Sequence, residues 1–139
     1  NTSLITDYLT NFSGEFIYST FLAPAQAGAA TAAIEIIRDS SESRQSLRST
    51  SKWFRGELNT IGLRCNLEAE SPIIPIIIGE IPATMALKKA LLDKGILVGA
   101  VRPPTVPDGT SRLRISLHSG VPHEQLEEAL KILKQWKSQ

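Results

Sequence analysis

The sequence has the size and composition of one ordinary globular domain. It has 139 residues, of which 42% are hydrophobic and 21% are charged, and both fractions lie near the average of folded domains, which argues against disorder. Lysine plus arginine number 15 against 14 for aspartate plus glutamate, so the formal net charge is +1. This balance gives no reason to expect binding to nucleic acid or to an anionic membrane surface.

No segment of the sequence is expected to enter a membrane. The longest apolar run, residues 73–78, contains Pro75 and is much shorter than the roughly 20 residues that span a bilayer. The chain opens without a charged and then apolar signal, and its single cysteine, Cys65, has no second thiol for a disulfide or a metal site. We therefore expect a cytoplasmic protein without a metal site, with Cys65 packed as a small hydrophobic residue on a strand.

The first part of the chain is predicted to be helical. Apolar residues at helical spacing predict an amphipathic helix over residues 3–12 that ends near Gly14, followed by an extended connection over residues 15–21. Pro24 suits the first turn of a second, alanine-rich helix over residues 25–38. Because small side chains let another backbone approach closely, this helix is expected to be buried, either against another domain or subunit or within its own domain.

The rest of the chain is predicted to be a long surface helix followed by a small α+β domain. Residues 40–61 are polar with a narrow apolar stripe, which predicts a helix with Gly62 as its C-terminal cap. The following elements are expected to be strands over residues 63–67, 73–78, 96–101 and 112–117, with helices over 82–94 and 122–136. This β-β-α-β-β-α order predicts a mainly antiparallel sheet with helices on one face. The 73–78 strand is apolar enough for burial on both faces, except that Pro75 argues for an edge or a bulge.

Three regions follow from these elements. We expect a helical region over residues 1–38, the long surface helix over 39–61, and the α+β domain over 62–139. The fold class is therefore predicted to be α+β, with N-terminal helices before a small sheet.

A stiff loop carries arginines into the last predicted strand. Three prolines and an Asp-Gly turn lie between Arg102 and Arg112, and each proline restricts its own φ and the residue before it. Strand alternation then places Arg112 and Arg114 on the face opposite Leu113. A guanidinium on a rigid frame suits a carboxylate, which it can bind bidentately. The pattern alone favours arginines that simply face solvent.

Two separated motifs resemble the pyridoxal-phosphate-dependent α-oxoamine synthases. The first is Ile-Tyr-Ser-Thr at residues 17–20 with Ala-Pro-Ala-Gln at 23–26, and the second is Arg-Pro-Pro-Thr-Val-Pro at 102–107 with Gly-Thr at 109–110 and Arg-Leu-Arg at 112–114. Their order and spacing match the family over essentially the whole chain. The resemblance implies the C-terminal domain of a fold-type I enzyme that uses pyridoxal 5'-phosphate (PLP) and acts as a homodimer.

The resemblance assigns binding roles to five residues. Arg114 matches the arginine that binds the α-carboxylate of the amino-acid substrate, and Arg102 and Thr105 match positions near the acyl-CoA substrate. Thr20, with Ser19 beside it, matches the hydroxyl that contacts the cofactor phosphate of the neighbouring subunit. From the pattern alone, two hydroxyls before a helix serve equally well as phosphate ligands or as helix caps.

The resemblance implies decarboxylative condensation of an amino acid with an acyl-CoA. The Arg-Pro-Pro run favours the branch that joins L-alanine to pimeloyl-CoA in biotin biosynthesis, and members that use acetyl-CoA or succinyl-CoA are the alternatives. None of the seven lysines lies in the family's Thr-x-x-Lys-x-x-Gly setting. We therefore expect no catalytic residue here and a C-terminal portion that is inactive alone and without a covalent link to the cofactor. The alternative of another class is a non-catalytic module that binds a small anion or dimerises through the alanine-rich helix.

The two histidines receive no catalytic role. The family often has a histidine seven residues after the substrate-binding arginine, but that position is Val121 here. His118 is expected at a strand end and His123 in the first turn of a helix. Arg112 is expected to be structural or to face solvent.

Overall fold

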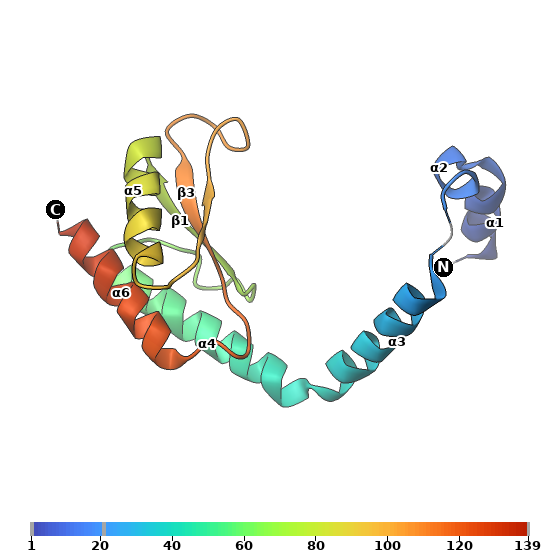
Figure 1. Cartoon of the computed structure of the whole chain (residues 1–139), viewed down its shortest axis with the longest axis horizontal. Helices are drawn as coiled ribbons and strands as arrows, with labels where there is room; N and C mark the ends of the chain where they lie inside the picture. The colour runs from blue at the N-terminus through green and yellow to red at the C-terminus, as the bar shows by residue number, and fades with distance from the viewer. Residues whose placement is uncertain (1, 21, 139) are drawn as a thin grey trace. The chain divides into compact units, whose positions relative to one another are not determined.

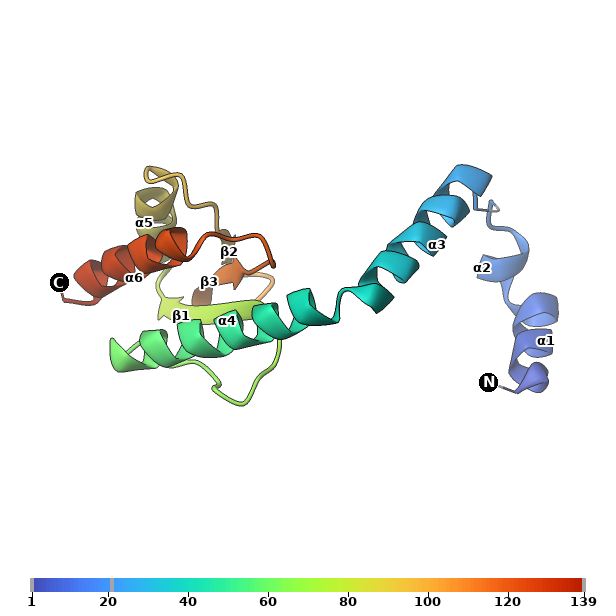
Figure 2. The ribbon, with the colours of Figure 1, turned by 90° about the horizontal axis from the view of Figure 1, so that it is seen from below.

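The computed structural model describes residues 2–20 and 22–138 and divides into two compact units, Asn1–Ser40 and Ser41–Gln139. The N-terminal unit consists of helices, whereas the C-terminal unit combines helices with a β-sheet (Figures 1 and 2). None of the helices formed by the described residues has the length and hydropathy needed to cross a bilayer.

The N-terminal unit contains one helix more than predicted. Its helices are α1 (Ser3–Phe12), α2 (Gly14–Ile17) and α3 (Pro24–Asp39). α1 and α3 confirm the two predicted helices, and Pro24 lies in the first turn of α3 as expected. α2 corrects the extended connection predicted over residues 15–21, of which Phe21 lies outside the described residues. The short helix forms because Ser13 Oγ accepts a hydrogen bond from Phe16 N at 3.4 Å and so caps the turn.

The helices of the N-terminal unit keep their apolar side chains exposed. No described residue of α1, α2 or α3 is buried, and the exposed fractions of Phe12 and Ile34 reach 73% and 66%. The alanine-rich helix α3 is therefore not buried within its own unit, which removes one of its two expected settings. Its packing against another domain or a second subunit stays a prediction.

The C-terminal unit is a three-stranded antiparallel sheet with helices. Its elements are α4 (Ser41–Thr60), β1 (Ile73–Gly79), α5 (Ile81–Leu92), β2 (Gly99–Val101), β3 (Ser111–Ser116) and α6 (His123–Lys137). The strand order is β1-β3-β2, so β3 is central and pairs with both neighbours. This arrangement confirms the predicted α+β class. Gly62 has a φ of 80° just past α4, in agreement with its predicted role as a helix cap.

The strand predicted over residues 63–67 does not form, so the order after α4 is β-α-β-β-α. Side chains of α4 donate hydrogen bonds to backbone carbonyls of this segment. In a sheet, the backbone of a neighbouring strand would supply such bonds. Asn59 Nδ2 donates to the carbonyl oxygen of Cys65 at 3.2 Å and also lies 3.2 Å from its sulfur. Cys65 is accordingly half-buried in an irregular segment rather than on a strand. β2 is also shorter than the strand predicted over residues 96–101.

A buried arginine holds the irregular segment against α4. The side chain of Arg55 is 1% exposed and donates to three backbone carbonyls: Asn66 O at 3.1 Å, Ser71 O at 2.9 Å and Ile73 O at 2.9 Å. Ser51 Oγ adds a bond of 2.9 Å to the same Ser71 carbonyl. Arg55 therefore fixes the path of the chain between the end of α4 and the first residue of β1, because the two outer nitrogens of this buried group find their partners there. Its Nε is buried without a partner among the described residues.

β1 is buried on one face only, which corrects the prediction of burial on both. Ile74 and Ile76 are fully or almost fully buried, whereas Ile73 and Ile77 are 48% and 61% exposed. β1 lies at an edge of the sheet, as Pro75 predicted, and its register with β3 is irregular between Ile77 and Gly79. The sheet thus has one face covered by helices and one open face.

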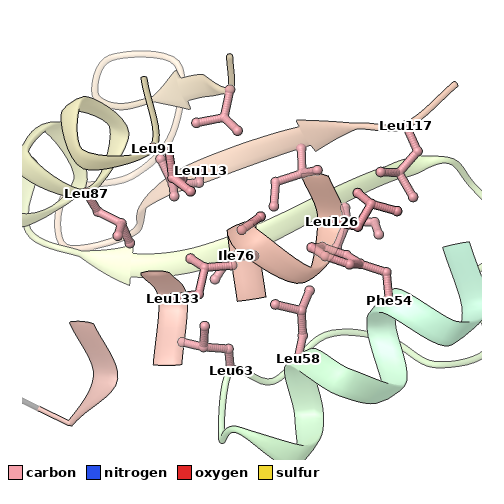
Figure 3. Packing of buried hydrophobic residues seen from close by; sticks show 14 residues of the cluster. Phe54, Leu58, Leu63, Ile76, Leu87, Leu91, Leu113, Leu117, Leu126 and Leu133 are labelled. Atoms are coloured by element: carbon pink, nitrogen blue, oxygen red, sulfur yellow. The ribbon is translucent and has the colours of Figure 1, made fainter. Parts of the chain in front are cut away.

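The core lies between the covered face of the sheet and the helices α4, α5 and α6 (Figure 3). Aliphatic side chains of β1 and β3 meet inward residues of all three helices there, together with Phe54. The buried apolar side chains labelled in Figure 3 are Phe54, Leu58, Leu63, Ile76, Leu87, Leu91, Leu113, Leu117, Leu126 and Leu133. Their inward positions leave Arg112, Arg114 and Ser116 of β3 on the other side of the sheet, whereas Ser111 is buried on the core side.

Replacing Arg55 by methionine is expected to destabilise the C-terminal unit. The variant keeps an apolar stem but removes three hydrogen bonds to backbone carbonyl oxygens, of which only Ser71 O keeps another side-chain donor, Ser51 Oγ. The total cost should be about 3 kcal/mol. Urea unfolding followed by tryptophan fluorescence measures this, since Trp53 and Trp136 both lie in the C-terminal unit. The matched control is Arg64→Met at an exposed position, where about 0.5 kcal/mol or less is expected. Equal stability of the two variants would contradict the anchoring role of Arg55.

Candidate functional site

The open face of the sheet centres on Arg114. This residue lies on the central strand β3, where it pairs with Pro75 of β1 and with Gly99 of β2. Strand alternation turns Arg114 away from the core because its neighbours Leu113 and Ile115 are buried. The structure therefore places this arginine in the middle of an exposed surface, flanked on both sides by a strand.

The side chain of Arg114 lies across β2. A Cβ atom built on Gly99 would stand 3.4 Å from Arg114 Nε and 3.5 Å from Arg114 Cβ, so the arginine stem passes over the glycine. Arg114 is exposed, and among the described residues no hydrogen bond or ion pair engages its guanidinium. The donors of a planar, permanently charged group are thus available to an anion.

The side chain of Arg112, on the same face, is hydrogen-bonded to its neighbour Thr110. Its Nε donates to the carbonyl oxygen of Thr110 at 3.1 Å, and an outer nitrogen lies 3.2 Å from Thr110 Oγ1. The side chain is half-buried. These bonds occupy donors that an incoming anion would need, so the two arginines of β3 differ in their availability.

The loop between β2 and β3 carries Arg102 and Thr105, and both are exposed. Thr105 N donates to Arg102 O at 3.0 Å, and Thr110 Oγ1 donates to Pro107 O at 2.7 Å, so local turns order the loop at both ends. Arg102 directly follows β2, three residues after Gly99, which corresponds to about 10 Å of extended backbone. Strand β2 therefore connects the two arginines: the Arg114 side chain lies over its first residue, Gly99, and Arg102 directly follows its last residue, Val101.

The two hydroxyls before α3 belong to the N-terminal unit, and both residues are exposed. Ser19 Oγ donates back to Phe16 O at 3.2 Å, and the N-cap of α3 is Ala23, without a side-chain hydrogen bond. Neither hydroxyl therefore caps α3, and helix capping, the alternative to phosphate binding for these two residues, does not occur at this helix. In the part of the chain that the structure describes, the Thr20 hydroxyl makes no hydrogen bond and is available to a phosphate oxygen.

The histidines occupy turn and helix positions. His118 lies just past β3, and its Nδ1 accepts a hydrogen bond from Gly120 N at 3.1 Å. His123 is the first residue of α6 and packs against Trp53 with ring centroids 4.2 Å apart and ring planes tilted by 37°. Both positions agree with the sequence prediction, and the ring contact additionally joins the start of α6 to α4.

The described residues supply no buried lysine and no metal site. Each of the seven lysines is exposed or half-buried, and Lys89 and Lys131 are paired with Asp93 and Glu128 at 2.7 and 3.4 Å. Within residues 2–20 and 22–138, no three His, Cys, Asp or Glu side chains gather as a metal ion would require. The groups that are exposed and unengaged among the described residues of the two motifs, such as the Arg114 guanidinium and the Thr20 hydroxyl, are hydrogen-bond donors that suit anions.

Sequence reasoning missed Gly99 and Pro75, the cross-strand neighbours of Arg114. A glycine inside a strand is a signal of close approach by another group. This signal was present in the sequence, but it could be assigned to Arg114 only once the register between β2 and β3 was known.

Comparison with known proteins confirms the resemblance found in the sequence. The family model for aminotransferase class I and II matches residues 2–133. The 8-amino-7-oxononanoate synthase of Aeromonas salmonicida (strain A449) is 39% identical over 129 residues, which cover 93% of this chain and 32% of that protein. The chain thus spans about a third of the length of the curated relatives that it matches.

Solved structures show the same relationship. The crystal structure of 8-amino-7-oxononanoate synthase from Francisella tularensis superposes with a TM-score of 0.84 at 28% identity, over 97% of this chain and 39% of that one. A high-resolution structure of SPT with PLP gives a TM-score of 0.84 at 25% identity, over 96% of this chain and 34% of that one.

Replacing Arg114 by alanine is expected to leave the fold intact. The side chain is exposed and makes no polar contact among the described residues, so the free energy of unfolding should change by about 0.5 kcal/mol or less. Leu113→Ala, one position away on the buried face, should cost about 3 kcal/mol because it opens a cavity in the core. Urea unfolding of both variants measures this contrast. A large loss for Arg114→Ala would assign this arginine to the fold instead of to a site.

Proposed function

Because the chain belongs to the aminotransferase class I and II family, we propose that it is the C-terminal part of a PLP-dependent acyltransferase of the α-oxoamine synthase type. The intact enzyme would condense L-alanine with pimeloyl-CoA, with loss of carbon dioxide, to 8-amino-7-oxononanoate in the cytoplasm. The similarity to synthases of this name supports the choice of reaction. The observation that carries the proposal is the unengaged guanidinium of Arg114 on the open face of the sheet.

Arg114 binds the α-carboxylate of the amino-acid substrate. Its planar fork matches a carboxylate with two parallel hydrogen bonds, and the central strand fixes its position from both sides. PLP, when bound, accepts the electron pair that is freed at the α-carbon of the substrate. The contribution of Arg114 is positional, because a carboxylate held in one place sets which bond at that carbon is presented for cleavage.

Arg102 and Thr105 bind the acyl-CoA substrate. The two residues lie in the loop that follows β2, and both side chains are exposed. The positive charge of Arg102 suits the distal carboxylate of a pimeloyl chain, and the Thr105 hydroxyl can donate a hydrogen bond. The ordered turns of the loop lower the entropy that these side chains lose on binding.

Ser19 and Thr20 contribute to the cofactor site of a partner subunit. The available Thr20 hydroxyl fits a phosphate oxygen as a hydrogen-bond donor, with Ser19 beside it. Under this proposal the enzyme is a homodimer in which each chain completes the other's site. The exposed apolar side chains of the N-terminal unit support a role for this unit in contacts with other parts of the assembly.

Two related reactions are alternatives within the family. A 2-amino-3-ketobutyrate CoA ligase would use acetyl-CoA, and a 5-aminolevulinate synthase would use succinyl-CoA. The Arg-Pro-Pro run at residues 102–104 favours pimeloyl-CoA, and a preference of the intact protein for either shorter acyl-CoA would favour an alternative. A non-catalytic module that binds an anion or dimerises through α3 is the alternative of another class, favoured by the exposure of α3.

In the intact protein, Arg114→Ala is expected to raise the KM for the amino acid by about 100-fold, because a charged hydrogen-bonded pair is lost. The KM for acyl-CoA should change little. Steady-state kinetics with each substrate varied in turn measures both values. Arg112→Ala is the matched control, since it removes a guanidinium of the same strand that is already bound to Thr110. Unchanged kinetics of Arg114→Ala would support the non-catalytic module.

The 139-residue chain by itself is expected to form no covalent bond with PLP and to turn over no substrate, because none of its seven lysines lies in the family's Thr-x-x-Lys-x-x-Gly setting. Borohydride reduction in the presence of PLP, followed by peptide mapping, measures labelling at each lysine. Stoichiometric labelling of one lysine together with condensation activity would refute the assignment as a C-terminal part.

A further inference from the structure

The surroundings of Arg114 are asymmetric. On the β1 side its cross-strand partner is Pro75, whose ring occupies the open face, and Ile73 and Ile77 stand to either side. On the β2 side the partner is Gly99, which has no side chain. Directly opposed residues in an antiparallel pair have Cβ atoms about 5 Å apart, so a side chain at position 99 that extends beyond Cβ would enter the space that the arginine stem uses.

Gly99 and the arginine are in contact along the stem. The Cβ position of Gly99 lies 3.4 Å from Arg114 Nε, 3.5 Å from Arg114 Cβ and 3.5 Å from Arg114 O. The stem is thus close to the backbone of β2 from its first carbon to the atom before the guanidinium carbon. An arginine that instead stood upright from the sheet would place Nε well away from the neighbouring strand.

We propose that Gly99 is a positioning residue: the absence of side-chain atoms beyond the Cβ position lets Arg114 lie flat across β2, and this sets the place and orientation of the guanidinium that receives the substrate carboxylate. The inference rests on the proposed function of Arg114 and extends it to a residue that touches no substrate. The flat path also directs the guanidinium over the strand that leads into Arg102, so Gly99 influences where the two arginines stand relative to each other.

The size of the side chain introduced at position 99 should decide whether Arg114 is displaced. An alanine Cβ would meet Arg114 at 3.4 to 3.5 Å, which is ordinary van der Waals contact, so Gly99→Ala should be tolerated. The γ-carbons of valine extend further over the face and would displace the stem. Valine is favoured in strands over glycine, so the sheet should be at least as stable, and a loss of substrate binding would not reflect a loss of fold.

The test compares Gly99→Ala, Gly99→Val and Arg114→Ala in the intact protein that contains this chain. Gly99→Val is expected to raise the KM for L-alanine by at least about tenfold, with the KM for acyl-CoA within about twofold and the Tm unchanged or higher. Gly99→Ala should stay close to the unmodified protein. Calorimetric titration of L-alanine into each folded variant gives the same comparison without turnover.

Ser116→Val is the matched control, because it places the same side chain on the same face of the sheet, opposite Ile73, and should leave both KM values unchanged. If Arg114→Ala raises the KM for L-alanine but Gly99→Val does not, the positioning role of Gly99 is wrong and the proposed function stands. If Arg114→Ala has no effect on that KM, the proposed function fails, and the role of Gly99 fails with it. Equal effects of Ser116→Val and Gly99→Val would also overturn the positioning role.

Discussion

The buried guanidinium of Arg55 is the interaction on which the C-terminal unit depends. It binds backbone carbonyls of residues 66, 71 and 73 and thereby connects α4 to the start of β1. Because the outer nitrogens of this buried charge find all three of their backbone partners in this segment and in the first residue of β1, the segment has little freedom to take another path. The first residue of β1 is fixed in this way, and its partner in β3 is Ser116. The anchoring of β1 therefore supports the register that turns Arg114 outward.

Much of the fold follows from local patterns that the sequence displays directly. Helical spacing predicted α1, α3, α4, α5 and α6, and alternation predicted the outward side of β3, because these periods act over a few neighbouring residues. Pro75 correctly predicted an edge strand, since a proline cannot donate in a sheet ladder. The failures have non-local or competing causes. Residues 63–67 alternate as a strand does, but Asn59 and Arg55 bind the backbone there, and a contact with a distant side chain cannot be read from periodicity.

The candidate site likewise combines residues that the sequence identifies with features that only the structure shows. Motif resemblance named Arg114, Arg102 and Thr105, and the structure adds what a motif cannot contain: Arg114 is unengaged, whereas Arg112 is bound to Thr110. Both arginines alternate outward on one strand, so the sequence pattern alone treats them alike. Gly99, in contrast, belongs to no motif. Its proposed role depends on cross-strand pairing, which joins residues 99 and 114 across a long loop.

Pro75 has a further consequence for the behaviour of the chain outside its native state. The run of isoleucines in β1 lies on a sheet edge with one exposed face, and short β-prone segments without charge are those that stack into intermolecular cross-β structures. A proline within such a run removes one main-chain donor and interrupts the uniform ladder that stacking requires. Pro75, the residue opposite Arg114, should therefore lower the tendency of unfolded chains to aggregate through this hydrophobic strand.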